Sequence, residues 1–391
     1  MNGQDGLRTT RRRVRTGALV AVLLAGLAIP LLRHQLGPAP DEPPGPAPAP
    51  VGPDVGRSEQ PIVYDVDLVD EQHGFALWGR CTNGRDYRCE RKLLTTTDGV
   101  VWNAHQFESG RPDGLSGRVI AISPGRVVLT GLDAADRRLY SADNGQTWQP
   151  VSATPQQTVT QLPSDAILET RCVDTVHDLG ECRNRRVVVT MPDSGRRAWL
   201  ADPPGLDAPA PRQRAAADGS WWVSGKEPAT GRWAAAASRD AGRSWTVTVL
   251  PVPPELMLDR LSLAGSGREV YALGIGSLVG AMEPNNLLAI FGSTDGGHTW
   301  AQTWRADGRP PRTLGGEAIV TADGALYVPP ADVGPGYRSR DGGHSFDVAL
   351  DGPRLTSVRH TRGGYLAVPT DHPGRYLSSP DGVRWSDVPL P

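Results

Sequence analysis

Lysine is almost absent from this 391-residue chain: only Lys92 and Lys226 occur, and arginine supplies nearly all of the positive charge. The 41 basic and 43 acidic residues give a formal net charge of −2. Residues 1–57 hold 7 of the basic and 4 of the acidic residues, which leaves 34 basic against 39 acidic residues in the remainder. Such a mildly acidic body lacks the broad basic face that binds a phosphate backbone, so we expect no nucleic-acid partner.

The signatures of several enzyme classes are also missing from the sequence. It contains no His-Glu-x-x-His metal site, no phosphate loop ending in Gly-Lys-Ser/Thr and no Gly-x-Ser-x-Gly nucleophile elbow. The Gly-rich stretch 274–280 precedes no evident helix, so we interpret it as a loop and not as a nucleotide site. His298 and His344 belong to repeated Gly-Gly-His phrases and are assigned to turns. We therefore expect no metal and no cofactor.

Long apolar runs are confined to one place near the amino terminus. Five arginines in residues 1–15 precede an uncharged, largely apolar run from Thr16 to Leu32, which Arg33 closes. A basic segment followed by such a run is an export signal, and 17 residues are at the lower limit for spanning a bilayer. We predict a transmembrane signal anchor at 16–33, with 1–15 in the cytoplasm and the rest outside. Gly26 and Ala28 leave a cleaved signal peptide as the alternative.

What is abundant is glycine and proline, with 46 and 36 residues. Eight of the prolines lie within residues 37–56, so we predict an extended polyproline II linker at 34–57. At about 3.1 Å per residue, this linker would hold the body roughly 60 Å from the membrane. A proline-rich ligand for a partner domain is the alternative. Beyond it, 38% apolar residues and frequent turn formers favour a β-rich folded body over a helical or disordered one.

The four cysteines form two local pairs. Cys81 and Cys89 enclose TNGRDYR, and Cys172 and Cys182 enclose VDTVHDLGE, each beside strand-like segments. Outside the cytoplasm, this pattern favours two disulfides that clamp hairpins. A zinc site is the alternative, although neither spacing resembles the two-residue knuckle that such sites favour.

One short phrase recurs along residues 58–391. It reads SADNGQTW at 141–148, SRDAGRSW at 238–245, STDGGHTW at 293–300 and SRDGGHSF at 339–346, with variants at 95–102 and 378–385. A degraded copy ends at Trp199, and the seven copies are spaced by about 47 residues, which is typical of propeller blades. Asp and Gly predict turns, and the aromatic residue predicts packing between blades. The structural residues of the six clear copies are Asp98, Trp102, Asp143, Trp148, Asp240, Trp245, Asp295, Trp300, Asp341, Phe346, Asp381 and Trp385.

These phrases resemble the Asp-box, or BNR, repeats of the sialidase superfamily, with the pattern Ser-x-Asp-x-Gly-x-Thr-Trp. The segment 64–79 also resembles the first strand pair of a blade in sortilin-like and photosystem-assembly-factor propellers. The resemblance implies an all-β, seven-bladed β-propeller over residues 58–391, with each Asp box between the third and fourth strands of its blade. The sequence does not indicate how the ring is closed, because the chain begins on an innermost strand and ends on an outermost one.

The resemblance also implies a functional face opposite the Asp boxes. Both cysteine pairs and the insertion 274–286 are expected there, in loops between second and third strands. Rigid or extended loops on one propeller face are typical of a recognition surface. The candidate ligand-binding residues are Arg85, Asp86, Tyr87, His177 and Asp178.

A sialidase needs three converging arginines, a Tyr nucleophile activated by Glu, and an acid/base Asp. The Arg-Ile-Pro phrase that normally carries the first arginine is missing, so no catalytic residue is assigned. We predict a membrane-anchored, non-catalytic recognition or assembly module outside the cytoplasm, with a cell-surface glycan or an exported protein as its partner. The alternatives are an exo-α-sialidase-like glycoside hydrolase and a purely structural envelope component.

Overall fold

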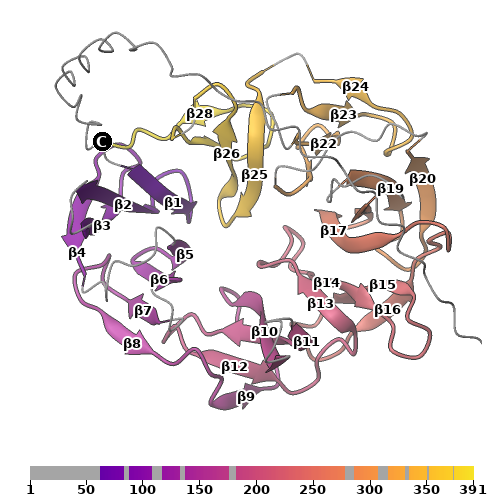
Figure 1. The fold of residues 1–391 in the computed structure, drawn as a ribbon, viewed down its shortest axis with the longest axis horizontal. Helices are drawn as coiled ribbons and strands as arrows, with labels where there is room; N and C mark the ends of the chain where they lie inside the picture. The colour runs from indigo at the N-terminus through magenta and orange to yellow at the C-terminus, as the bar shows by residue number, and fades with distance from the viewer. Residues whose placement is uncertain are drawn as a thin grey trace, which may run out of the picture. The chain divides into compact units, whose positions relative to one another are not determined.

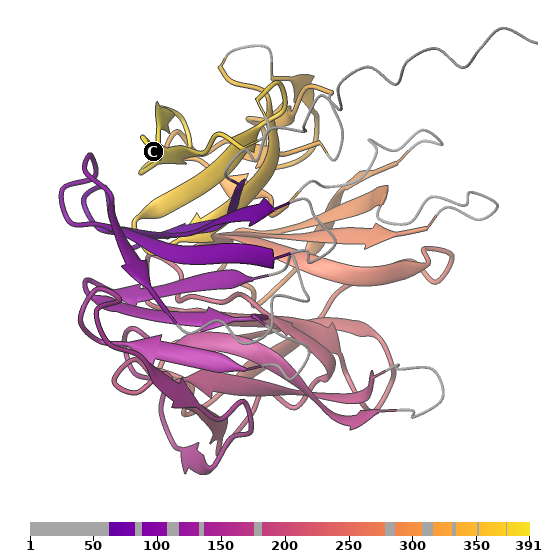
Figure 2. The ribbon, with the colours of Figure 1, turned by 60° about the vertical axis from the view of Figure 1, so that its left-hand side comes forward.

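The computed structural model describes residues 62–82, 88–107, 117–132, 137–175, 182–277, 286–306, 316–330, 334–349, 352–372 and 374–391. In this part of the chain, 28 strands form seven four-stranded sheets. Figure 1 shows the sheets arranged in a ring around a central axis, and Figure 2 shows the same ring turned by 60°, which confirms the predicted all-β, seven-bladed propeller. The predicted anchor 16–33 and linker 34–57 lie outside the described residues. Within the described ranges, no helix is long and apolar enough to cross a membrane.

The blades are lettered A to G, and their strands are given from the channel outward. Blade A is β1 (Ile62–Leu68), β2 (Gly74–Thr82), β3 (Arg88–Thr96) and β4 (Asn103–Gln106). Blade B is β5 (Arg118–Ser123), β6 (Arg126–Thr130), β7 (Arg138–Ser141) and β8 (Gln149–Val151). Blade C is β10 (Ile167–Thr175), β11 (Cys182–Thr190), β12 (Arg197–Leu200) and β9 (Gln157–Val159). Blade D is β13 (Asp207–Pro211), β14 (Trp221–Lys226), β15 (Trp233–Ser238) and β16 (Thr246–Val249).

The remaining three blades follow the order of A, B and D. Blade E is β17 (Leu258–Ser266), β18 (Glu269–Gly276), β19 (Asn286–Ser293) and β20 (Ala301–Arg305). Blade F is β21 (Ile319–Val320), β22 (Leu326–Val328), β23 (Tyr337–Ser339) and β24 (Asp347–Val348). Blade G is β25 (Leu355–Thr361), β26 (Gly364–Pro369), β27 (Leu377–Ser379) and β28 (Ser386–Asp387).

Blade C departs from the pattern of the others. Its outermost strand, β9, precedes the other three in sequence and pairs with β12 in parallel, whereas the neighbouring pairs are antiparallel. As a result, Cys172 and Cys182 join β10 and β11, the innermost strands of the sheet in Figure 1. The prediction of a loop between second and third strands is therefore wrong for this pair. The prediction failed because it assumed that the first strand of each blade is the innermost one. In blade C the first strand, β9, is the outermost, so β10 and β11 take the two innermost positions.

The repeated phrases form turns between the third and fourth strands of the other six blades. In blade B, the Ser141 hydroxyl donates to Asp143 Oδ1 over 2.8 Å, and the N–H of Gly145 donates back to the hydroxyl oxygen over 2.8 Å. The N–H and hydroxyl of Thr147 both donate to the Asp143 carboxylate. Asn144 and Gly145 have φ angles of 58° and 78°, which explains why Asn or Gly suits these positions. The same bonds recur in the turns that begin at Ser238, Ser293 and Ser339.

The aromatic residue that ends each phrase packs between blades. Trp148 packs against the apolar cluster between blades A and B, and Trp245 packs against the cluster between C and D. Trp300, Phe346 and Trp385 occupy corresponding positions in later blades. The core therefore consists of successive apolar layers between neighbouring sheets.

The ring closes without any exchange of strands, because blade A contains only the first four strands and blade G only the last four. Side chains make the seam instead: Val66 and Leu94 of blade A share an apolar cluster with Leu366 of blade G. Arg359 of β25 also pairs with Asp65 of β1 over 2.8 Å. Gly363 lies so close to blade A that a Cβ there would stand 2.5 Å from the Asp70 Cα. The seam therefore requires glycine at this position.

Candidate recognition groove and central channel

The predicted site residues Arg85, Asp86, Tyr87, His177 and Asp178 lie outside the described residues. Their flanking strands are described, and the Cα atoms of Cys81 and Cys89 are direct cross-strand partners. The predicted disulfide between Cys172 and Cys182 is present, with a Cα–Cα distance of 5.7 Å. It ties the ends of β10 and β11 together beside a large cavity.

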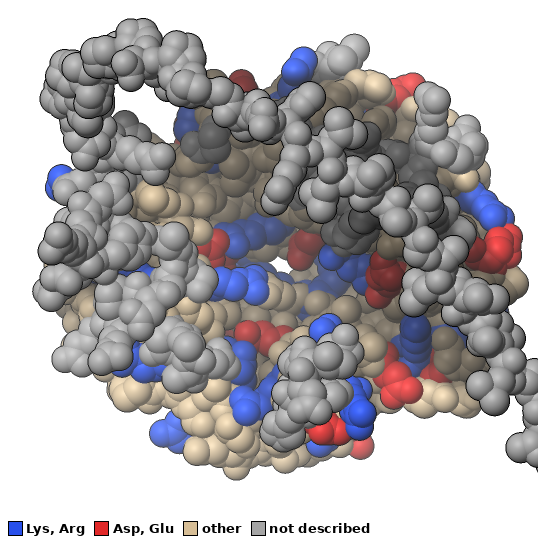
Figure 3. Space-filling model, in the orientation of Figure 1, with Lys and Arg blue, Asp and Glu red and all other residues tan. Residues whose placement is uncertain are grey.

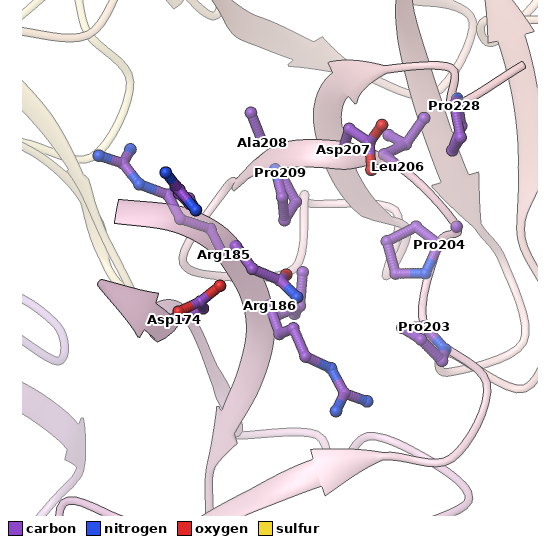
Figure 4. A pocket seen from close by; sticks show the side chains of 14 residues that line it. Asp174, Arg185, Arg186, Pro203, Pro204, Leu206, Asp207, Ala208, Pro209 and Pro228 are labelled. Atoms are coloured by element: carbon purple, nitrogen blue, oxygen red, sulfur yellow. The ribbon is translucent and has the colours of Figure 1, made fainter. Parts of the chain in front are cut away.

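That cavity is a groove of about 810 Å³ between β11 and the segment that leads into β13. One wall carries Arg183, Asn184, Arg185 and Arg186, and the other is residues 203–209. Figure 4 shows the proline-rich segment across the groove from the strand that carries Arg185 and Arg186. Pro228, from the connection between β14 and β15, completes the lining. Because this connection and the β15–β16 turn lie at opposite ends of the sheet, the groove opens on the face opposite the repeated turns.

The groove's arginines are exposed and form no ion pair with any residue that the structure describes. The Arg186 guanidinium lies over the Trp199 ring at 4.5 Å, on the face of the sheet that packs toward blade B, so Arg183 and Arg185 are the arginines on the groove side. Asp174 and Asp207 are the carboxylates of the lining. The prolines opposite add rigid apolar surface and few backbone N–H groups. This combination suits an extended ligand that carries negative charge.

The central channel is lined by charged residues that bind one another across the ring. Arg214 of blade D donates to Asp67 of blade A over 2.8 Å and to the Ala121 carbonyl of blade B over 2.6 Å. Asp67 also accepts the N–H of Ala121, and Asp65 accepts that of Val119. Figure 3 shows basic and acidic side chains gathered around the central opening. Ionic bonds between blades that are not neighbours therefore brace the ring.

Two further ionic groups extend this bracing. Arg362 of blade G binds Asp165 over 2.9 Å and the Ile122 carbonyl over 3.0 Å. Glu169 of β10 binds Arg138 of blade B over 3.1 Å and Arg197 of its own blade over 3.3 Å. Burial alone would raise the pKa of Glu169, but the charges of Arg138 and Arg197 and the Thr190 hydroxyl outweigh it and lower the pKa to about 2.

Arg212 is bonded differently from the other channel arginines. Its Nη1 donates to the Gly265 carbonyl, and its Nη2 donates to His360 Nε2 over 3.0 Å. Both acceptors are uncharged. The carbonyl carries no charge of its own, and the imidazole is neutral because burial and the charges of Arg212 and Arg214 lower the pKa of His360 to about 3. Burial also lowers the pKa of Arg212. In contrast, Arg214, Arg359 and Arg362 each pair with a carboxylate.

The described part of the channel offers no assembled sialidase site. Arg214 and Arg359 are engaged by Asp67 and Asp65, so they are not free to bind the carboxylate of a substrate. The Tyr365 hydroxyl donates to the Val320 carbonyl over 2.8 Å and not to a glutamate. The groove, whose exposed arginines form no ion pair within the described ranges, is therefore the stronger candidate for ligand binding.

Comparison with known proteins gives no family for this chain. No protein-family model matches the sequence, and no curated protein matches it. Solved structures with a similar fold include YCF48 bound to a D1 peptide, at 16% identity over 84% of this chain and 83% of that one, with a TM-score of 0.33.

Two other solved structures are a catalytically inactive virginiamycin B lyase from Staphylococcus aureus with quinupristin and an α-L-arabinanase from Penicillium chrysogenum with arabinobiose. The lyase is 11% identical over 80% of this chain and 94% of that one, with a TM-score of 0.44. The arabinanase is 14% identical over 83% and 88%, with a TM-score of 0.38. Such distant similarity concerns the propeller fold and carries no activity across.

Proposed function

We propose that this chain is a non-catalytic recognition module outside the cytoplasm that binds an acidic, extended segment of an exported protein in the groove between β11 and residues 203–209. The amino-terminal sequence, with its basic residues and apolar run, supports anchoring to the cell membrane through residues 16–33. The observation that carries the proposal is the pair of exposed arginines, Arg183 and Arg185, on the groove side of β11, neither of which forms an ion pair with a described residue.

The spacing of these arginines suits a peptide better than a single small anion. At about 3.3 Å per residue along a strand, Arg183 and Arg185 are roughly 7 Å apart at their Cα atoms. Alternate residues of an extended peptide are separated by a similar distance, so two acidic side chains could meet the two guanidinium groups together. The disulfide between Cys172 and Cys182 holds this wall in place before binding, which reduces the entropy lost on binding.

The test is binding of a fluorescent nonapeptide of alternating Glu and Gly, followed by fluorescence anisotropy. We expect saturable binding that weakens with salt, because the attraction is between exposed charges. Replacing Arg185 by Glu should weaken binding by at least about tenfold, given that hydrogen bonds between charged groups contribute more than neutral ones. The matched control is Arg340→Glu, an exposed arginine in the blade F turn on the opposite face.

Equal loss of binding in the Arg340 variant would mean that net charge alone attracts the peptide, and the groove would then be discarded as the site. A lysine-containing peptide of the same length should not bind. Turnover of a fluorogenic sialoside by the native protein would instead favour the hydrolase hypothesis, and the peptide proposal would be withdrawn.

A further inference from the structure

A second cavity, of about 270 Å³, opens beside the channel on the face of the repeated turns. It lies where the β17–β18 turn, the start of blade F and the β27–β28 turn meet, and Arg212, His360 and Tyr365 form its inner wall. In a four-stranded antiparallel sheet, the turn after the first strand and the turn after the third lie at the same end. This cavity and the groove therefore lie on opposite faces of the ring.

Arg212 provides an unneutralised positive charge at the base of this cavity. A guanidinium has five N–H donors, and here the two recorded bonds go to a main-chain carbonyl and a neutral imidazole. The nearest carboxylates, Glu317 and Asp218, influence Arg212 only through space. Donors that keep their positive charge in a partly buried position favour a bidentate anion such as a carboxylate.

The other lining residues limit the charge and the chemical nature of the carboxylate that the cavity can accept. Val320, Ala322 and Pro380 provide apolar surface on the side of blades F and G. Glu269 is exposed and belongs to the lining, so a second negative charge on the ligand would be repelled. Asp381 also lines the cavity, but its carboxylate already accepts the N–H groups of Val383 and Arg384 within its own turn.

We propose that this cavity binds a small aliphatic monocarboxylate, with its carboxylate on the Arg212 guanidinium and its carbon chain against Val320, Ala322 and Pro380. His360 fixes the guanidinium by accepting one N–H, and it adds no charge of its own while it stays neutral. The volume, close to the lower end of small-molecule sites at about 300 Å³, limits the ligand to a few carbon atoms.

The experiment is calorimetric titration of the full-length protein with butyrate, with ionic strength held constant by sodium chloride. We expect saturable binding at one site, and Arg212→Gln should raise the Kd at least about tenfold because the charged partner of the carboxylate is lost. Arg268→Gln is the matched control: Arg268 is exposed on the adjacent turn, and its loss removes the same charge from outside the cavity. Its Kd should equal that of the native protein.

A second variant keeps the test independent of any folding defect at Arg212. Ala322→Phe places a bulky ring at an exposed wall position, so butyrate binding should be lost while Arg212 stays in place. Absence of saturable binding in the native protein, an unchanged Kd in Arg212→Gln, or equal binding of butylammonium would each overturn the proposal. Binding of the Glu-Gly peptide should not change in either variant. The proposal for this cavity and the proposal for the groove can therefore be refuted independently of each other.

Discussion

Replacing Glu169 by Gln should destabilise the propeller at neutral pH and have much less effect in acid. The carboxylate lies between Arg138 and Arg197, and the exposed fractions of the three side chains are 13%, 0% and 9%. Glutamine keeps the shape but removes the negative charge that lies between the two buried guanidinium groups. Removing one partner from a buried ion pair costs about 3–5 kcal/mol in the free energy of unfolding.

The lowered pKa of Glu169 gives a second value for the free energy of unfolding that this ion pair contributes. A carboxyl group whose pKa falls from 4.5 in the unfolded chain to about 2 in the folded protein contributes about 3 kcal/mol at neutral pH. Because the folded-state pKa is the lower one, this contribution is complete above pH 4.5 and is lost as the pH falls toward 2. The two estimates agree, so we expect a loss of about 3 kcal/mol at pH 7 in the variant.

The assay is urea unfolding followed by tryptophan fluorescence at pH 7, pH 5 and pH 3, for the native protein and the variant. The difference in free energy should be largest at pH 7 and should narrow at pH 3, where Glu169 is already protonated in the unfolded chain but still mostly ionised in the folded protein. Glu255→Gln is the control, since Glu255 forms an exposed pair with Arg305 and its loss should leave the urea midpoint unchanged. A difference for Glu169→Gln that is small at pH 7, or constant with pH, would refute the reasoning.

Three further predictions concern the turns and the cysteines. Asp295→Ala should lower the melting temperature, because Asp295 accepts hydrogen bonds from Ser293, His298 and Thr299. The control is Asp202→Ala, which removes an exposed carboxylate without such bonds and should leave the melting temperature unchanged. Equal melting temperatures of the two variants would contradict a structural role for the turn. Replacing Cys172 and Cys182 by Ser should lower the free energy of unfolding by about 2–3 kcal/mol, as expected for a loop of this length. Peptide mapping of exported protein without reductant should link Cys81 to Cys89, and free thiols at these positions would contradict that pairing.

The blade pattern could be predicted because the bonds that create each turn are local. Ser141, Asp143, Gly145 and Thr147 satisfy one another within seven residues, so the phrase itself encodes the turn. The same locality explains why the cysteine pair at 172 and 182 was predicted. Blade C shows the limit of such reasoning: its degraded phrase predicted a blade, but nothing in it indicated that β9 would pair in parallel with β12.

The candidate sites depend on contacts between distant parts of the chain. The arginine run at 183–186 is visible in the sequence, but its position opposite residues 203–209 follows only from the packing of blade C against blade D. Arg212 meets His360 across 148 positions, and Arg214 meets Asp67 across 147. No periodicity marks these residues among so many arginines. Local bonds in the sequence therefore determine the blades, whereas closure of the ring decides which charges are neutralised and which stay available to a ligand.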